Sequence, residues 1–137
     1  DILVFSEKGY LQMTEVNVGL AGGVAHVRRH LGESDARLML LTARRMYGPD
    51  LLRMGVASAC TAPEDLMETA LDIARDIAKA SPSAVRAAKA SFQVTEGQSV
   101  YDGYRFEQGQ TKALSTSQDS AEAMAAFQEK RKPVFKP

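Results

Sequence analysis

Glu15 lies between an apolar stretch and a glycine-rich segment, and its neighbours Met13, Val16 and Val18 are apolar. We therefore expect the carboxyl group to be partly buried. A carboxyl group in apolar surroundings can act as a general acid or base near neutral pH. One carboxylate near glycines is not a motif, however. Taken alone, the spacing fits a hinge glutamate bound to a backbone amide better than a catalytic acid.

Glycines follow at 19–23, where the sequence reads Gly-Leu-Ala-Gly-Gly and includes Gly22 and Gly23. Such a segment at the start of a helix can present backbone N–H groups to an anion or a developing oxyanion. It matches neither the dinucleotide-binding glycine motif nor a P-loop. Taken alone, a tight turn is the simpler interpretation.

His26 and His30 are four residues apart, which is the spacing of two metal ligands on one helix face. Arg28 and Arg29 lie between them and would repel a cation. A zinc site usually needs three or four ligands, whereas the chain has no other histidine and only one, remote, cysteine. We therefore predict no metal site, and we interpret Cys60 as a small core residue.

Phe127 and Lys130 are three residues apart, so we expect them on one face of the last helix. An aromatic ring beside an ammonium group can bind a purine base and its phosphates. The same pair also suits a core phenylalanine beside a lysine whose alkyl chain lies along apolar surface. The pattern leaves both interpretations open.

The first half of the chain, residues 1–60, mixes short strand-like runs, glycine-rich turns and short helices. Its first apolar run, at 2–5, suits a strand in a parallel or mixed sheet. Gly32 is the predicted C-cap of a helix over 24–31, and Ser34 or Asp35 the predicted cap of the next helix. The other elements expected in this half are strands at 10–13 and 56–60 and a short helix at 51–54.

The second half, residues 61–137, is expected to be almost entirely helical. Thr61 precedes a proline and two acidic residues, which is typical of a helix start. The sequence Ser-Pro-Ser at 81–83 ends this helix and caps the next one, which stops at Gly97. Further helices are expected over 99–115 and 121–130.

The composition limits the class of protein. The chain has 137 residues, of which 45% are hydrophobic and 25% charged, as in globular proteins with a real core. Seventeen basic and seventeen acidic residues cancel, so we expect no nucleic-acid partner. No apolar run approaches the roughly 20 residues that span a bilayer, so we expect no membrane partner. A single cysteine and no signal peptide favour a cytoplasmic location, and the start at Asp1 is typical of the interior of a longer protein.

The order of several segments resembles the enoyl-CoA hydratase/isomerase (crotonase) family. TEVNVG at 14–19 resembles the family's Pro-Glu-hydrophobic-x-hydrophobic-Gly stretch, and LLTARRM at 40–46 resembles its LLTG stretch. GVA at 55–57 is similar to its GLV strand, and SPSA at 81–84 with Lys89 to its SP-x-A…K helix. AAFQEKRKPVF at 125–135 resembles the family's C-terminal signature, AF-x-EKR-x-P-x-F.

This resemblance implies an α/β fold of two regions. Residues 1–60 would be the C-terminal portion of a crotonase-like (ClpP/crotonase) β/α spiral core, and residues 61–137 an all-helical oligomerisation region that forms homotrimers or hexamers. It also implies an acyl-CoA substrate, with coenzyme A as part of that substrate and no separate cofactor. The thioester carbonyl would lie in an oxyanion hole of two backbone N–H groups that stabilises an enolate.

The resemblance assigns roles to five residues. Glu15 is implied to be the second of two hydratase glutamates, the one that supplies the C2 proton. Gly22 or Gly23 is implied to line the reacting end of the substrate. Phe127 and Lys130 are implied to meet the adenine–phosphate portion of coenzyme A, often that of a neighbouring subunit.

The sequence also departs from the family pattern. The family's first glutamate and first oxyanion donor would precede Asp1, Thr14 replaces the usual proline, and the glycine loop is a few residues shorter than in typical hydratases. We predict an enoyl-CoA hydratase of fatty acid metabolism that adds water across the 2,3 double bond of a 2-enoyl-CoA. The alternatives are isomerisation or other enolate chemistry on the same fold, and a non-catalytic fragment that only oligomerises.

Overall fold

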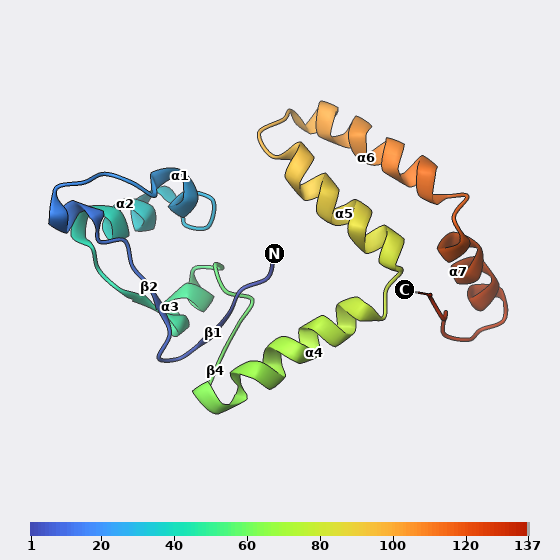
Figure 1. The fold of residues 1–137 in the computed structure, drawn as a ribbon, viewed down its shortest axis with the longest axis horizontal. Helices are drawn as coiled ribbons and strands as arrows, with labels where there is room; N and C mark the ends of the chain where they lie inside the picture. Colours follow the sequence, from blue (N-terminus) through green and yellow to red (C-terminus); the bar gives the residue numbers. More distant parts are fainter. Residues whose placement is uncertain (137) are drawn as a thin grey trace. The chain divides into compact units, whose positions relative to one another are not determined.

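The structure, a computed structural model, describes residues 1–136 (Figure 1). It contains two compact units, of which the first is Asp1–Asp72 and the second begins at Ile73. The division between them falls within helix α4 (Leu66–Ala78).

The first unit contains two small sheets. Strand β1 (Val4–Ser6) pairs in parallel with β4 (Ala59–Thr61), and β2 (Tyr10–Leu11) pairs antiparallel with β3 (Met46–Tyr47). The strand predicted from the apolar run at 2–5 is therefore present at Val4–Ser6, in a parallel pair.

The last strand of this unit is shorter than the predicted segment 56–60. The N–H groups of Val56 and Ala57 both donate to the carbonyl oxygen of Leu51, at 2.9 and 3.1 Å, and cannot join the ladder. Both side chains are buried in the core, so their apolar character reflects a packed turn and not a strand.

Four short helices lie between the strands of the first unit: η1 (Glu15–Val18), α1 (Val24–Val27), α2 (Glu33–Thr42) and α3 (Gly48–Arg53). The predicted helix over 24–31 is wrong in length. The N–H groups of Arg29 and His30 bond three residues back, at 3.2 and 3.1 Å, which tightens the chain into turns after Val27.

Gly32 has a different role from the one predicted. Its backbone is extended, with φ −60° and ψ 158°, and it is the N-cap of α2 rather than the C-cap of α1. Ser34 and Asp35 then lie inside the first turn of α2, so neither caps it. Glu33 is held there by Arg28, at 2.7 Å, and by Arg37, at 2.6 Å.

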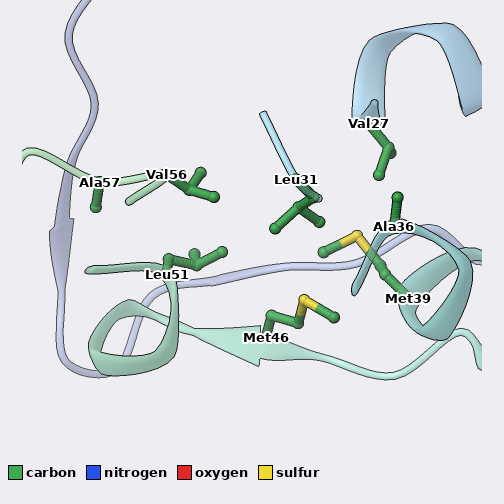
Figure 2. Packing of buried hydrophobic residues seen from close by; sticks show 8 residues of the cluster. All are labelled: Val27, Leu31, Ala36, Met39, Met46, Leu51, Val56 and Ala57. Atoms are coloured by element: carbon green, nitrogen blue, oxygen red, sulfur yellow. The ribbon is translucent and has the colours of Figure 1, made fainter. Parts of the chain in front are cut away.

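The core of the first unit is built by side chains from α1, α2, β3, α3 and the turn that follows it (Figure 2). Met39 and Leu51 are almost completely buried, at 1% and 0% exposure, and each contributes about 2 kcal/mol through burial. Gly48 is required beside this core because a β-carbon there would lie 2.3 Å from the carbonyl oxygen of Ser6. The cluster comprises Val27, Leu31, Ala36, Met39, Met46, Leu51, Val56 and Ala57.

The second half of the chain is helical, as predicted. After the 3-10 turn η2 (Pro63–Asp65) come α4, α5 (Pro82–Thr95), α6 (Val100–Leu114) and α7 (Gln118–Gln128). Helices α5 and α6 pack against each other (Figure 1). Gly103 allows their close approach, since a β-carbon there would lie 3.3 Å from Thr95.

Serine side chains cap three of these helices. Ser81 accepts a hydrogen bond from the N–H of Ala84, Ser99 from that of Asp102, and Ser117 from that of Ser120, each at 3.1 Å. Helix α7 therefore begins at Gln118, earlier than predicted, because the cap is Ser117.

Asp119 lies in the first turn of α7 and does not cap it. It accepts hydrogen bonds from the hydroxyl groups of Ser81 and Ser83, both at 2.6 Å, and so ties α7 to the start of α5. The hydroxyl of Ser81, then that of Ser83, holds the pKa of Asp119 below its usual value.

Candidate functional site

Glu15 is the first residue of the short helix η1, whose N-cap is Thr14. The carbonyl oxygen of Glu15 accepts a hydrogen bond from the N–H of Leu20 at 2.9 Å. Gly19 adopts the left-handed conformation, with φ 73°, that ends the helix. The local backbone thus holds Glu15 in place and turns the chain back toward the glycines that follow.

The carboxyl group of Glu15 has an unusual environment. Its Oε2 atom is buried and lacks a hydrogen-bond partner, and it is the one side-chain oxygen or nitrogen within residues 1–136 of which this is true. A buried polar atom without a partner is destabilising, and such atoms in folded proteins often have a catalytic role. One oxygen atom of the Glu15 carboxyl group therefore has hydrogen-bonding capacity that the described residues do not use.

A cavity of about 100 Å³ lies beside Glu15. Apart from the glutamate its walls are apolar, and two of them, Leu40 and Leu41, come from α2. Apolar walls beside one carboxyl group suit proton transfer to or from a carbon atom. The cavity is lined by Glu15, Val16, Ala21, Gly22, Val24, Leu40 and Leu41.

Gly22 covers the Glu15 side chain. A β-carbon at this position would lie 3.7 Å from Cγ of Glu15 and 4.0 Å from its Oε1. Gly23 does not line the cavity, but it is the N-cap of α1 and has φ 73°. A β-carbon on Gly23 would lie 2.0 Å from Cε of Met13, the end of a flexible side chain that can shift, so it is the positive φ that favours glycine.

The structure brings Glu15 and Gly22 together as the sequence suggested, and it adds Leu40 and Leu41, which sequence reasoning did not single out as site residues. The sequence signal for these leucines is the LLTG-like segment at 40–46, which gives them a place in the family pattern but does not show that they line a cavity with Glu15. Their spacing alone reads as ordinary core periodicity, because α2 also carries the buried Met39.

Phe127 and Lys130 belong to the second unit. Phe127 lies in the last turn of α7 with 82% of its surface exposed. The prediction that both residues share a helix face is wrong, since α7 ends at Gln128 and Lys130 has φ 54°. The N–H of Lys130 donates to the carbonyl of Phe127 at 3.2 Å and that of Arg131 to Ala126 at 3.0 Å, which is a Schellman ending.

The histidines also do not share a helix face. His26 lies in α1, whereas His30 lies in the turns beyond its end, and both are exposed. Within residues 1–136 no three His, Cys, Asp or Glu side chains are grouped so as to hold a metal ion. No helix in the same range has the length and apolar character needed to cross a membrane.

Comparison with known proteins decides the family. The family model for enoyl-CoA hydratase/isomerase matches residues 1–137. The chain belongs to the enoyl-CoA hydratase/isomerase family. The resemblance inferred from the ordered segments is therefore confirmed, and Glu15 and its cavity lie in a member of this crotonase family.

Curated relatives of this family member include carnitinyl-CoA dehydratases. Those of Salmonella heidelberg (strain SL476) and Proteus mirabilis (strain HI4320) are each 32% identical to it over 143 residues. The alignments cover 99% of this chain but 55% of each relative. The chain thus spans about half the length of the curated relatives it matches.

Solved structures agree with this assignment. An enoyl-CoA hydratase/isomerase from Mycobacterium paratuberculosis has a TM-score of 0.94 at 26% identity, over 99% of this chain and 53% of that one. An enoyl-CoA hydratase from Bacillus anthracis has a TM-score of 0.93 at 27% identity, over 99% and 54%. The chain shares the crotonase fold over this length, as a mostly helical α/β structure.

Proposed function

We propose that the protein carrying this chain is an enoyl-CoA hydratase, which adds water across the 2,3 double bond of a 2-enoyl-CoA thioester. The observation that carries the proposal is the buried Oε2 atom of Glu15, without a hydrogen-bond partner and beside an apolar cavity. Family membership supplies the reaction class in which such an acid has a use.

In this reaction Glu15 acts as an acid. The oxygen of water forms a bond to C3 as the double bond breaks, and the electron pair moves to the thioester as an enolate. Glu15 then gives its proton to C2, and the proton released by the water goes to the family's first glutamate, which would precede Asp1. Leu40 and Leu41 supply apolar walls beside the carboxyl group, next to the carbon atom that receives the proton.

Dehydration of a 3-hydroxyacyl-CoA is the second candidate, because the curated relatives are named carnitinyl-CoA dehydratases. This is the same chemistry in reverse, so Glu15 would remove the C2 proton instead of supplying it. In isomerisation of a 3-enoyl-CoA, Glu15 would remove the C2 proton to form a dienolate, and the proton would return at C4 as the double bond moves to the 2,3 position. The pocket of Glu15 therefore supports a shared proton transfer at C2, and the substrate distinguishes the three reactions.

Coenzyme A would enter as part of the substrate, with no separate cofactor. We assign its adenine–phosphate portion to Phe127 and Lys130, which present an exposed aromatic ring and a cation near the end of α7. No hydrogen bond or ion pair engages the Lys130 side chain within the described range 1–136, so its ammonium group is available to phosphate.

We further propose that the chain corresponds to the C-terminal part of the family fold and forms homotrimers or hexamers through residues 61–137. Gly103 and Ala126 are the only buried residues in the described part of the second unit, 73–136. Large apolar side chains on α5 and α6 are exposed, among them Phe92 at 80% and Val100 at 91%. Such a surface favours burial against other subunits.

We also propose that the enzyme is cytoplasmic and has no membrane or nucleic-acid partner.

The test is turnover of crotonyl-CoA, followed by loss of the conjugated thioester absorbance, on a sample whose intact mass is compared with 14.9 kDa. Glu15→Gln keeps the shape of the side chain but removes the transferable proton. We expect it to lower kcat about 10²–10⁴-fold while coenzyme A binding is retained. The control is Glu7→Gln, which removes an exposed acid from the turn before β2.

The choice of substrate separates the candidate functions. Turnover of carnitinyl-CoA or of a 3-enoyl-CoA, with crotonyl-CoA unreactive, would replace hydration by dehydration or isomerisation. Coenzyme A binding without turnover of any of the three would identify a non-catalytic member of the family. Full activity in Glu15→Gln would contradict the role of Glu15.

A further inference from the structure

Lys130 has a backbone conformation that lysine rarely adopts. It occupies the position after the C-cap of α7 with φ 54°, where glycine is the common residue. A side chain at such a position is retained only where surrounding contacts determine the conformation. Contacts of the neighbouring residues therefore have to hold Lys130 in this left-handed conformation.

Glu122, two turns back in α7, holds the segment that follows Lys130. Its Oε1 accepts hydrogen bonds from Nη1 of Arg131 at 2.5 Å and from the N–H of Val134 at 2.8 Å. Its Oε2 accepts from Nη2 of Arg131 at 3.0 Å. This paired contact is the strong form of a carboxylate–guanidinium interaction, and it folds the tail back along the helix.

The charged residues on either side of Lys130, Glu129 and Arg131, both take part in ion pairs. Nε of Arg131 also donates to Glu129 at 2.5 Å, so the residues that flank Lys130 are tied to each other as well as to Glu122. The guanidinium group of Arg131, then the N–H of Val134, lowers the pKa of Glu122 to about 2. The Glu122 carboxylate is thus ionised at physiological pH, as the contact with Arg131 requires.

We propose that Glu122 is a positioning residue for coenzyme A. By clamping Arg131 and Val134 it holds Lys130 in the left-handed conformation that presents the ammonium group to the phosphates of the ligand. Glu122 itself does not touch the ligand. This inference rests on the contact proposed above between Lys130 and coenzyme A.

The test is the dissociation constant of the intact protein for coenzyme A and for pantetheine, measured by isothermal titration calorimetry. Pantetheine lacks the adenine–phosphate portion and should not sense Lys130. Glu122→Gln should weaken coenzyme A binding roughly three- to tenfold, because a smaller fraction of molecules has Lys130 correctly placed. Pantetheine binding should not change.

Glu129→Gln is the matched control. It removes the same charge from the other acid that contacts Arg131 but leaves the paired contact with Glu122 intact, so coenzyme A binding should stay within twofold, as roughly expected for an exposed site. If Glu122→Gln does not fold, Arg131→Lys replaces it, since lysine keeps the charge but cannot bond both carboxylate oxygens in this way.

The double variant decides between positioning and stability. If Glu122 acts through Lys130, adding Glu122→Gln to Lys130→Ala produces no further loss of coenzyme A affinity. A full additional loss, or an equal loss for pantetheine, would show that Glu122 only stabilises the fold and would overturn the inference. If Lys130→Ala alone leaves coenzyme A binding unchanged, the proposed contact is wrong and the inference fails with it.

Discussion

Glu15→Met tests whether the buried carboxyl group serves catalysis at a cost in stability. Methionine is unbranched, close to glutamate in length and apolar, as are the other walls of the cavity, including Leu40 and Leu41. The substitution removes the one buried side-chain atom that lacks a partner in the range 1–136. It should therefore raise the free energy of unfolding while it abolishes turnover.

The magnitude follows from the environment of the carboxyl group. Leaving a buried polar atom without a partner costs about 1–3 kcal/mol. Glu15 as a whole is only half-buried, so we expect the lower end, a gain of about 1 kcal/mol. For a chain of this size that gain raises Tm by roughly 4 °C.

The assay combines thermal unfolding, followed by circular dichroism, with turnover of the enoyl-CoA substrate. Glu7→Met is the control, because Glu7 is exposed and its replacement should change stability by less than about 0.5 kcal/mol and leave activity intact. A Glu15→Met variant that unfolds more easily than the unmodified protein would refute the reasoning, because it would make Glu15 a structural acid.

Three further predictions concern the core, the glycine loop and the tail. Leu51→Ala should lower the free energy of unfolding by about 3 kcal/mol, measured by urea denaturation, because Leu51 is 0% exposed; a loss below about 1 kcal/mol would contradict the described packing. Gly23→Ala should lower the free energy of unfolding by about 1–2 kcal/mol, because Gly23 has a positive φ. Gly22→Ala should leave Tm unchanged but lower kcat/KM, because the added methyl group contacts Glu15. Equal losses of Tm in the two variants would disprove this distinction. The pKa of Glu122 falls from 4.5 to about 2 on folding, so its contribution to stability is complete above pH 4.5 and is lost as the pH falls toward 2. The difference in unfolding free energy between the unmodified protein and Glu122→Gln should therefore shrink across that window, and a constant difference would argue against the ion pair.

Much of the local structure could be predicted because its causes lie within a few residues. Serine before proline at Ser81 starts α5, and Ser99 starts α6, since a side-chain oxygen satisfies a free backbone N–H three residues on. The same logic failed near Gly32, where sequence alone does not distinguish a C-cap from an N-cap. There the extended backbone of Gly32 and the hydrogen bond from the N–H of Ala36 to its carbonyl oxygen, at 2.9 Å, make it the start of α2.

Some features of the candidate site can likewise be predicted from the sequence, and others depend on the fold. The position of Glu15 before a glycine loop, and the ordered family segments, are properties of the sequence, and family comparison confirms the family they indicate. The sequence does not show that the Oε2 atom of Glu15 lacks a hydrogen-bond partner. That property depends on every group that packs around the carboxyl group, including Leu40 and Leu41 from α2.

The segment after α7 shows most clearly what sequence periodicity cannot predict. From the sequence, helical periodicity puts Phe127 and Lys130 on one face, and nothing in that periodicity links Glu122 to Arg131, nine residues further on. Only the tertiary structure decides that α7 stops at Gln128, because the paired contact between Glu122 and Arg131 stabilises a tail folded back on the helix. Sequence periodicity describes contacts within an element, whereas such a pair forms only once the chain has reversed.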